Sequence, residues 1–249
     1  MFYLMSGPEG GSPMKEVLVF TPTPNEYKGI RKHLDGASFR NFRARVVESG
    51  LGKINAAFAV AQEASVMAGR GQRPAFIVGA GTSGSLSLEL ASGDVIASSS
   101  ATISDWRMED DSDRHYGRFP EINYQSADTI LADALAMNCP DPLVEKLMDR
   151  LAAHGLKRGR MLTSDTFVVG AGHKLGLGRN FGCLACDMES GAFAYAAQER
   201  LGGVPWFNLR VVADTLDDAL HDYINMEVDM VDILGARTVF ALTTLDELM

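Results

Sequence analysis

Three carboxylates stand where apolar segments of the sequence end. Glu26 follows the segment EVLVF at 16–20, Glu189 follows CLACDM at 183–188, and Asp214 closes VPWFNLRVVAD at 204–214. If these segments are strands of one sheet, their ends share an edge, and open α/β sheets bind ligands there. Such a set can protonate a leaving group, deprotonate a water and stabilise the positive charge that develops between them.

Each carboxylate also has a purely structural interpretation. Asp214 could cap the turn that begins at Thr215. Glu26 and Glu189 could be no more than favourable negative charges at helix N-termini. The apolar approach Val-Val-Ala before Asp214 favours burial, which raises the pKa of a carboxyl and lets it keep a proton for donation.

Two other motifs match known binding patterns only in part. Gly79 to Gly84 fits G-x-G-x-x-G, but it lacks the lysine of a P-loop, and LSLELASGDV after it is too short for a crossover helix. Cys183 and Cys186 fit C-x-x-C without a second ligand pair at zinc spacing, so we interpret them as small core residues of a strand. No metal or cofactor is indicated.

Composition excludes several classes of protein. A chain of 249 residues with 46% hydrophobic content can fill the core of one large domain. Its net charge of -9 is unsuited to nucleic acid, which proteins bind mainly through Lys and Arg on phosphates. No apolar run of about 18 residues would span a membrane. We therefore expect a soluble protein that binds a small molecule.

The N-terminus and the cysteines indicate the compartment. Residues 1–14 have no basic leader or longer apolar run, so we expect a flexible extension rather than a secretory signal. Three cysteines cannot form a disulfide framework and suit a reducing environment. The expected location is the cytoplasm.

Residues 15–249 alternate between short apolar runs and longer helical ones, the pattern of an α/β fold in one domain. The pattern predicts strands at 16–20, 43–50, 74–79 before a Gly-rich turn, 93–104 as one strand or a pair, 159–168, 183–189 and 204–215. It predicts helices at 24–34, 53–69, 126–137, 141–154, 190–202 and 222–247. Residues 105–125 are polar and acidic without periodicity, which is typical of a functional loop, an interface or a solvated face.

In order, the strand ends resemble the purine and uridine nucleoside phosphorylase superfamily, and within it the 5'-methylthioadenosine/S-adenosylhomocysteine nucleosidases. The matching stretches are VFTPTPNE (19–26), ESGLGKINAA (48–57), VGAGTSGSL (78–86), GDVIAS (93–98), YGRFP (116–120), TSDTFV (163–168), CDMESGAFAYAA (186–197) and LRVVADTLDD (209–218). The series covers nearly everything from residue 15 to 235. It implies a three-layer α/β/α fold with a mixed central sheet, and hydrolysis of the N-glycosidic bond of a purine nucleoside to release adenine.

The resemblance also implies catalytic roles. Asp214 would protonate N7 of the purine, and Glu26 would hold and activate a water. Met188 and Glu189 would grip the ribose, with Glu189 accepting hydrogen bonds from its hydroxyls. Breaking an N-glycoside passes through an oxocarbenium-like state, which these three carboxylates suit.

Five further residues would complete the pocket. Phe167 would stack on the purine, the backbone of Val168 would read its edge, and Thr82 would supply a small hydroxyl. Leu51 and Pro120 complete the expected substrate contacts. The family suggests a homodimer in which YGRFP lies near the partner's pocket, and it implies no cofactor.

Three other functions stay open. A purine nucleoside phosphorylase would need cations for phosphate, yet Gly79 stands where hexameric phosphorylases have Arg, and TPTPNEYKG lacks their early Gly and Arg ligands. A futalosine hydrolase would take a bulkier 5' group, and the acidic loop from Trp106 to His115 has altered residues near that part of the pocket. Ala213 also stands where the nucleosidases often have Ser. Retention of all three carboxylates argues against a catalytically silent nucleoside-binding protein.

Overall fold

The computed structural model describes residues 14–105, 107–109, 115–117, 136–216 and 228–249. Its strands are β1 (Lys15–Thr21), β2 (Phe42–Glu48), β3 (Phe76–Ser85), β4 (Val95–Ser98), β5 (Ser100–Ile103), β6 (Arg107–Glu109), β7 (His115–Gly117), β8 (Ala136–Asn138), β9 (Lys157–Arg158), β10 (Met161–Thr163), β11 (Ala185–Asp187) and β12 (Trp206–Asp214). Its helices are α1 (Pro24–Leu34), α2 (Gly52–Ala68), α4 (Pro142–Ala153), α5 (Ala171–Phe181), α6 (Ser190–Tyr195) and α8 (Val228–Leu248), with a π-helical turn at Ala196–Arg200.

Ten strands form one mixed sheet, in the order β8-β5-β10-β11-β3-β12-β4-β9, with β1 between β2 and β3. The pairs β1–β2, β1–β3, β3–β12 and β10–β11 are parallel. The pairs β3–β11, β4–β12 and β5–β8 are antiparallel. β3 touches β1, β11 and β12, so it brings together the strands that carry the candidate site.

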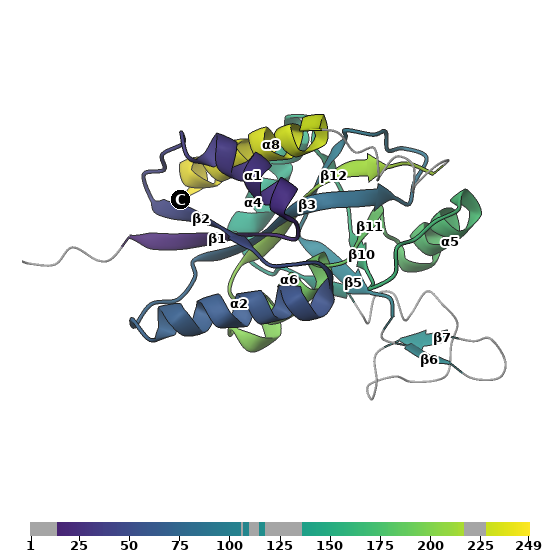
Figure 1. The fold of residues 1–249 in the computed structure, drawn as a ribbon, viewed down its shortest axis with the longest axis horizontal. Helices are drawn as coiled ribbons and strands as arrows, with labels where there is room; N and C mark the ends of the chain where they lie inside the picture. The colour runs from purple at the N-terminus through teal and green to yellow at the C-terminus, as the bar shows by residue number, and fades with distance from the viewer. Residues whose placement is uncertain (1–13, 106, 110–114, 118–135, 217–227) are drawn as a thin grey trace, which may run out of the picture.

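Helices cover both faces of this sheet (Figure 1). On one face, Ile30 of α1, Leu147 of α4 and Leu234 of α8 share a buried cluster with alternate residues of β1, β3 and β12. On the other face, Val60 of α2 and Phe193 of α6 pack with the intervening residues. The structure therefore confirms the predicted three-layer α/β/α fold with a mixed central sheet.

The segment predicted as a Gly-rich turn after residue 79 is instead the second half of β3. Its glycines are required by close neighbours. A Cβ at Gly79 would lie 2.2 Å from Oδ1 of Asn208 and 2.6 Å from the Phe193 ring. Contacts across the sheet, which no local pattern displays, explain why a glycine-rich sequence continues as a strand.

Several other predictions differ in detail. The 93–104 segment is a strand pair, β4 and β5, and the 190–202 helix is α6 followed by the π-helical turn. The predicted loop at 105–125 contains the β6–β7 hairpin. The predicted helix at 126–137 lies outside the described residues apart from its last two, which belong to β8. The predicted extension at 1–14 lies outside them up to residue 13.

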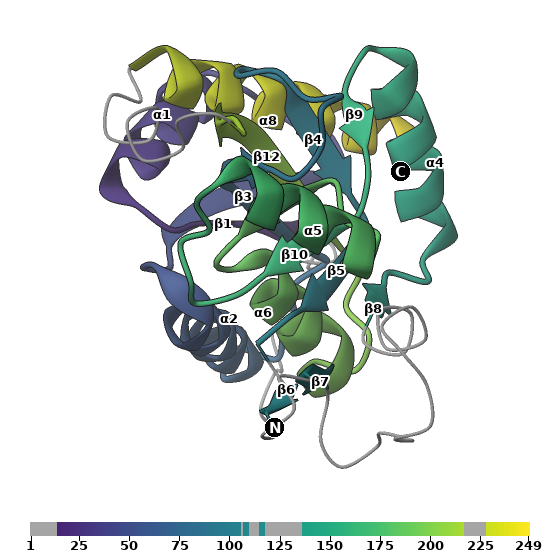
Figure 2. The ribbon, with the colours of Figure 1, turned by 90° about the vertical axis from the view of Figure 1, so that its right-hand side faces the viewer.

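Helix α5 was not predicted from the sequence. It lies beyond the carboxyl end of β3 (Figures 1 and 2). Of its eleven residues only Lys174 is buried, so it has no apolar stripe that a periodicity search would find. In the part of the chain that the structure describes, no helix is long and apolar enough to cross a membrane.

Candidate active site

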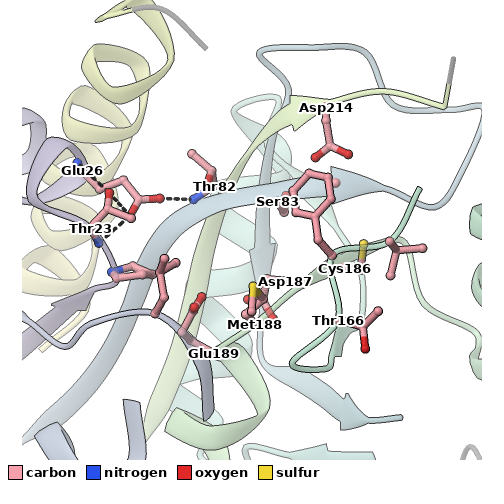
Figure 3. Close-up of a pocket in the computed structure, with 15 residues that line it drawn as sticks. Thr23, Glu26, Thr82, Ser83, Thr166, Cys186, Asp187, Met188, Glu189 and Asp214 are labelled. Atoms are coloured by element: carbon pink, nitrogen blue, oxygen red, sulfur yellow. Dashed lines mark hydrogen bonds between the residues drawn. The ribbon is translucent and has the colours of Figure 1, made fainter. Parts of the chain in front are cut away.

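A pocket opens at the carboxyl ends of β1, β10, β11 and β12. It is lined by Pro22, Thr23, Glu26, Leu51, Thr82, Ser83, Gly84, Thr166, Phe167, Val168, Cys186, Asp187, Met188, Glu189 and Asp214. Figure 3 shows Glu26 and Asp214 on opposite sides of this space, with β3 running between them. The sequence-predicted residues brought together here are Glu26, Leu51, Thr82, Phe167, Val168, Met188, Glu189 and Asp214. The predicted Pro120 lies outside the described residues.

Glu26 combines a structural contact with a position in the pocket. It completes a capping box at the start of α1, where its Oε2 accepts hydrogen bonds from the Thr23 backbone N–H at 2.9 Å and the Thr23 hydroxyl at 2.7 Å. Its Oε1 accepts the backbone N–H of Thr82 at 2.8 Å. Oε2 of Glu26 therefore has the helix-end role that the structural interpretation gave it, while Oε1 bonds to β3 in the wall of the pocket.

Glu189 lies at the start of α6, yet its side chain does not cap that helix. Its Oε1 accepts the backbone N–H of Gly52, the first residue of α2, at 2.9 Å. Its Oε2 lies 3.3 Å from Nη1 of Arg210. Burial raises the pKa of Glu189 to about 7, against the lowering effect of Arg210.

Asp187, rather than Glu189, accepts a hydrogen bond at the N-terminus of α6. It accepts the backbone N–H of Ser190 at 3.1 Å and the hydroxyl of Thr163 at 2.7 Å. Its Oδ2 also lies 2.8 Å from Nε of Arg210. Because Asp187 caps α6, the neighbouring Glu189 side chain is left to line the pocket.

Arg210, on β12, ties Asp187 and Glu189 together from beneath the pocket. Its side chain is fully buried, and its Nη2 has no hydrogen-bond partner among the described residues. A Cβ at Gly81 would lie 2.4 Å from Nη1 of Arg210 and 3.2 Å from Oε1 of Glu26. Gly81 is therefore what allows the guanidinium and the Glu26 carboxylate to approach the same point of β3.

Asp214 is the last residue of β12 and lies beside Gly84 of β3, two residues after Thr82. A Cβ at Gly84 would lie 2.8 Å from both carboxyl oxygens of Asp214. Oδ2 of Asp214 accepts a hydrogen bond from Nζ of Lys174 at 2.5 Å. Both side chains are buried, at the edge of the pocket.

Three apolar residues also line the pocket. Phe167 is 38% exposed and Leu51 is 51% exposed, while Val168 is buried. Exposed apolar side chains around an otherwise polar pocket suit a ligand with a flat aromatic part and an apolar substituent.

Sequence reasoning missed Arg210 and Lys174. Both are charged residues that lie fully buried against carboxylates of other elements. The one signal for Arg210 was a lone arginine in the apolar strand WFNLRVVAD, because an unpaired buried cation is so costly. Lys174 stands in a glycine-rich segment with no such signal.

The family model of the phosphorylase superfamily matches residues 10–245. The chain belongs to this superfamily. No curated protein sequence matches the chain.

Solved structures of two nucleosidases and of a futalosine hydrolase share this fold. The 5'-methylthioadenosine/S-adenosylhomocysteine nucleosidase of Helicobacter pylori has a TM-score of 0.74 and 20% identity, covering 93% of this chain and 99% of its own. The futalosine hydrolase of the same organism has a TM-score of 0.73 and 20% identity, covering 95% and 99%. The S-adenosylhomocysteine nucleosidase of Streptococcus pyogenes has a TM-score of 0.70 and 21% identity, and the match covers 95% of this chain and 98% of its own. At these identities the likeness shows the fold alone.

Proposed function

We propose that this superfamily member hydrolyses the N-glycosidic bond of a purine nucleoside of the 5'-methylthioadenosine/S-adenosylhomocysteine type and releases adenine. The observation that carries the proposal is the placing of Glu26 and Asp214. Glu26 bonds to β3 at Thr82, and Asp214 meets β3 at Gly84, on opposite sides of one pocket. A base and an acid so separated can act on opposite sides of the bond that breaks.

In the proposed reaction the bond between the sugar carbon and the purine nitrogen breaks, and its electron pair goes to the purine. Asp214 gives its proton to N7, so the base leaves neutral. Glu26 positions a water and takes its proton as the oxygen bonds to the sugar. Glu189, 2% exposed, accepts hydrogen bonds from the ribose hydroxyls beside Met188 and stabilises the cationic sugar.

The remaining predicted residues fit the nucleoside around this centre. Phe167 stacks on the purine and the backbone of Val168 reads its edge. Thr82 and Leu51 contact the sugar and its 5' substituent. These assignments are supported by the place of all four residues in the lining of the pocket.

Charge favours water over phosphate as the acceptor. Among the described lining residues there are four carboxylates, Glu26, Asp187, Glu189 and Asp214, and no lysine or arginine. Phosphate sites use cationic side chains or helix N-termini on the anion, and the α2 N-terminus already bonds to Glu189 through Gly52. A neutral water suffers no repulsion here.

We therefore expect adenine release from methylthioadenosine in phosphate-free buffer, with the free sugar as the second product. Adding phosphate should leave the rate unchanged. The measurement is chromatography of base and sugar with and without phosphate. A phosphate requirement together with a sugar 1-phosphate product would show that the protein is a phosphorylase.

The futalosine hydrolase structure matches almost as well as the nucleosidase, so futalosine is the second candidate substrate. The two compounds differ in the bulk of the 5' group. Comparing kcat/KM for methylthioadenosine and futalosine in the same buffer decides between them. A higher value for futalosine would retain hydrolysis and replace the substrate.

Glu189→Gln should lower kcat/KM for ribosides by about 10 to 10²-fold, the usual worth of a hydrogen bond to a charged group, and lower it far less for 2'-deoxyribosides. Since burial raises the pKa of Glu189 to about 7, its accepting carboxylate form appears only as pH rises through that value. Riboside cleavage should therefore rise through about pH 7 in the wild type and lose this rise in the variant. An equal loss of kcat/KM on ribosides and 2'-deoxyribosides would mean that Glu189 contacts the 3'-hydroxyl or has only a structural role.

We also propose a homodimer and a cytoplasmic location. Three apolar side chains near the start of α2 are exposed: Leu51 at 51%, Ile54 at 82% and Phe58 at 67%. Such a patch is typical of an interface. The three free cysteines suit a reducing compartment. Sedimentation at the mass of one chain would contradict the dimer.

A further inference from the structure

Lys174 is a charged residue that α5 buries. It is the single buried residue of the eleven in α5, and its side chain has no exposed surface. Its Nζ donates to Oδ2 of Asp214 at 2.5 Å and to the backbone carbonyl of Thr215 at 2.6 Å. A buried ammonium is costly unless carboxylates and carbonyls compensate it, and an apolar residue would attach the helix at lower cost. We therefore look for the role of Lys174 in its interaction with Asp214.

Lys174 cannot meet the substrate directly in this arrangement. It is absent from the described lining of the pocket, whereas Asp214 is part of it. Its ammonium thus lies behind the carboxyl group that faces the ligand. Any effect of Lys174 on the reaction passes through Asp214.

We propose that Lys174 is a positioning residue for the proton donor, holding the Asp214 carboxyl in place and stabilising the carboxylate that remains once its proton has left. This inference rests on the proposed function. When the bond to the sugar breaks, the electron pair goes to the purine and the proton of Asp214 goes to N7. The carboxylate so formed lies 2.5 Å from Nζ of Lys174, where a low-dielectric setting strengthens the attraction.

The other described groups near Asp214 supply no free positive charge. Burial raises the pKa of the Cys186 thiol to about 12, so that neighbour is neutral. Asp187, the next acidic group, is already paired with Nε of Arg210 at 2.8 Å. Gly84 presents only backbone to Asp214. Among the described side chains, Lys174 is the cation bonded to this carboxyl.

The test compares a purine riboside with an aryl riboside whose phenolate leaves without protonation. Lys174→Met should lower kcat/KM for methylthioadenosine by roughly 10 to 10²-fold, part of the effect of general acid catalysis, and lower it for the aryl riboside by less than about 3-fold. Because Lys174 acts through Asp214, the same change in an Asp214→Asn background should cost less than about 3-fold on either substrate. A residue that only attaches α5 would lower both rates equally.

Controls separate this result from misfolding and from failure of the proposed function. Arg45→Met removes an ion pair remote from the pocket, with Glu16 and Glu63, and should leave the ratio of the two rates unchanged. If Lys174→Met does not fold, Lys174→Gln, which keeps a donor but not the charge, should show the same substrate dependence. Equal losses on both substrates would overturn the role of Lys174 alone. A wild-type protein that cleaves the aryl riboside but no purine nucleoside would overturn the proposed function and this role with it.

Discussion

Asp214→Asn is expected to lower purine release from methylthioadenosine by roughly 10² to 10⁴-fold, the usual contribution of general acid catalysis. The amide keeps the shape of the side chain but cannot supply the proton that makes the base a neutral leaving group. The loss should shrink on an activated nucleoside whose base leaves without protonation, because such a substrate demands little of the acid. Initial rates on both substrates, with thermal melting as the check on folding, measure this.

Glu26→Gln is the matched control for that prediction. Its carboxylate is argued to act on the water, so its loss should be equally large on the adenine nucleoside and on the activated analogue. The contrast is informative because the two residues meet β3 only two positions apart, at Thr82 and Gly84. If Asp214→Asn lost as much activity on the activated analogue as on the adenine nucleoside, with folding intact, the acid role would be withdrawn from Asp214.

The largest effect on stability is expected for Arg210→Met. Arg210 is fully buried, and its loss would leave the carboxylates of Asp187 and Glu189 without their cation. Breaking a buried pair by removing one partner costs about 3 to 5 kcal/mol of the free energy of unfolding. Urea unfolding followed by circular dichroism measures the change.

Arg45→Met is the control, measured by the same urea unfolding. Arg45 also bridges two carboxylates, Glu16 at 2.6 Å and Glu63 at 2.7 Å, but its side chain is 38% exposed. Solvent screens such a pair, so the expected loss is below about 1 kcal/mol. Adding Asp187→Asn and Glu189→Gln to Arg210→Met should restore part of the lost stability, because the uncompensated charges are then gone. Equal losses for the two arginine variants would contradict the assignment.

The limits of sequence-based prediction are clearest at α5. Its sequence AGHKLGLGRNF has three glycines, which lower helix propensity, and no apolar stripe. Its place depends on contacts with distant segments, among them the hydrogen bond from Lys174 to Asp214, 40 residues further along the chain. Neither propensity nor periodicity records a contact of that kind.

By itself the sequence determined the alternation of strands and helices, since that follows from local periodicity, and it placed Glu26, Glu189 and Asp214 at or after the ends of apolar segments that are strands. The expected common edge is wrong for Glu189, because β11 runs antiparallel to β3 and its carboxyl end points toward the middle of that strand. The tertiary structure decided how those carboxylates are held. It put Arg210 against Glu189 and Lys174 against Asp214, and it kept β3 extended through Gly81 so that Arg210 could approach Glu26. These are charge pairings between distant segments, and their energies depend on burial and distance in the folded chain, which no stretch of sequence specifies locally.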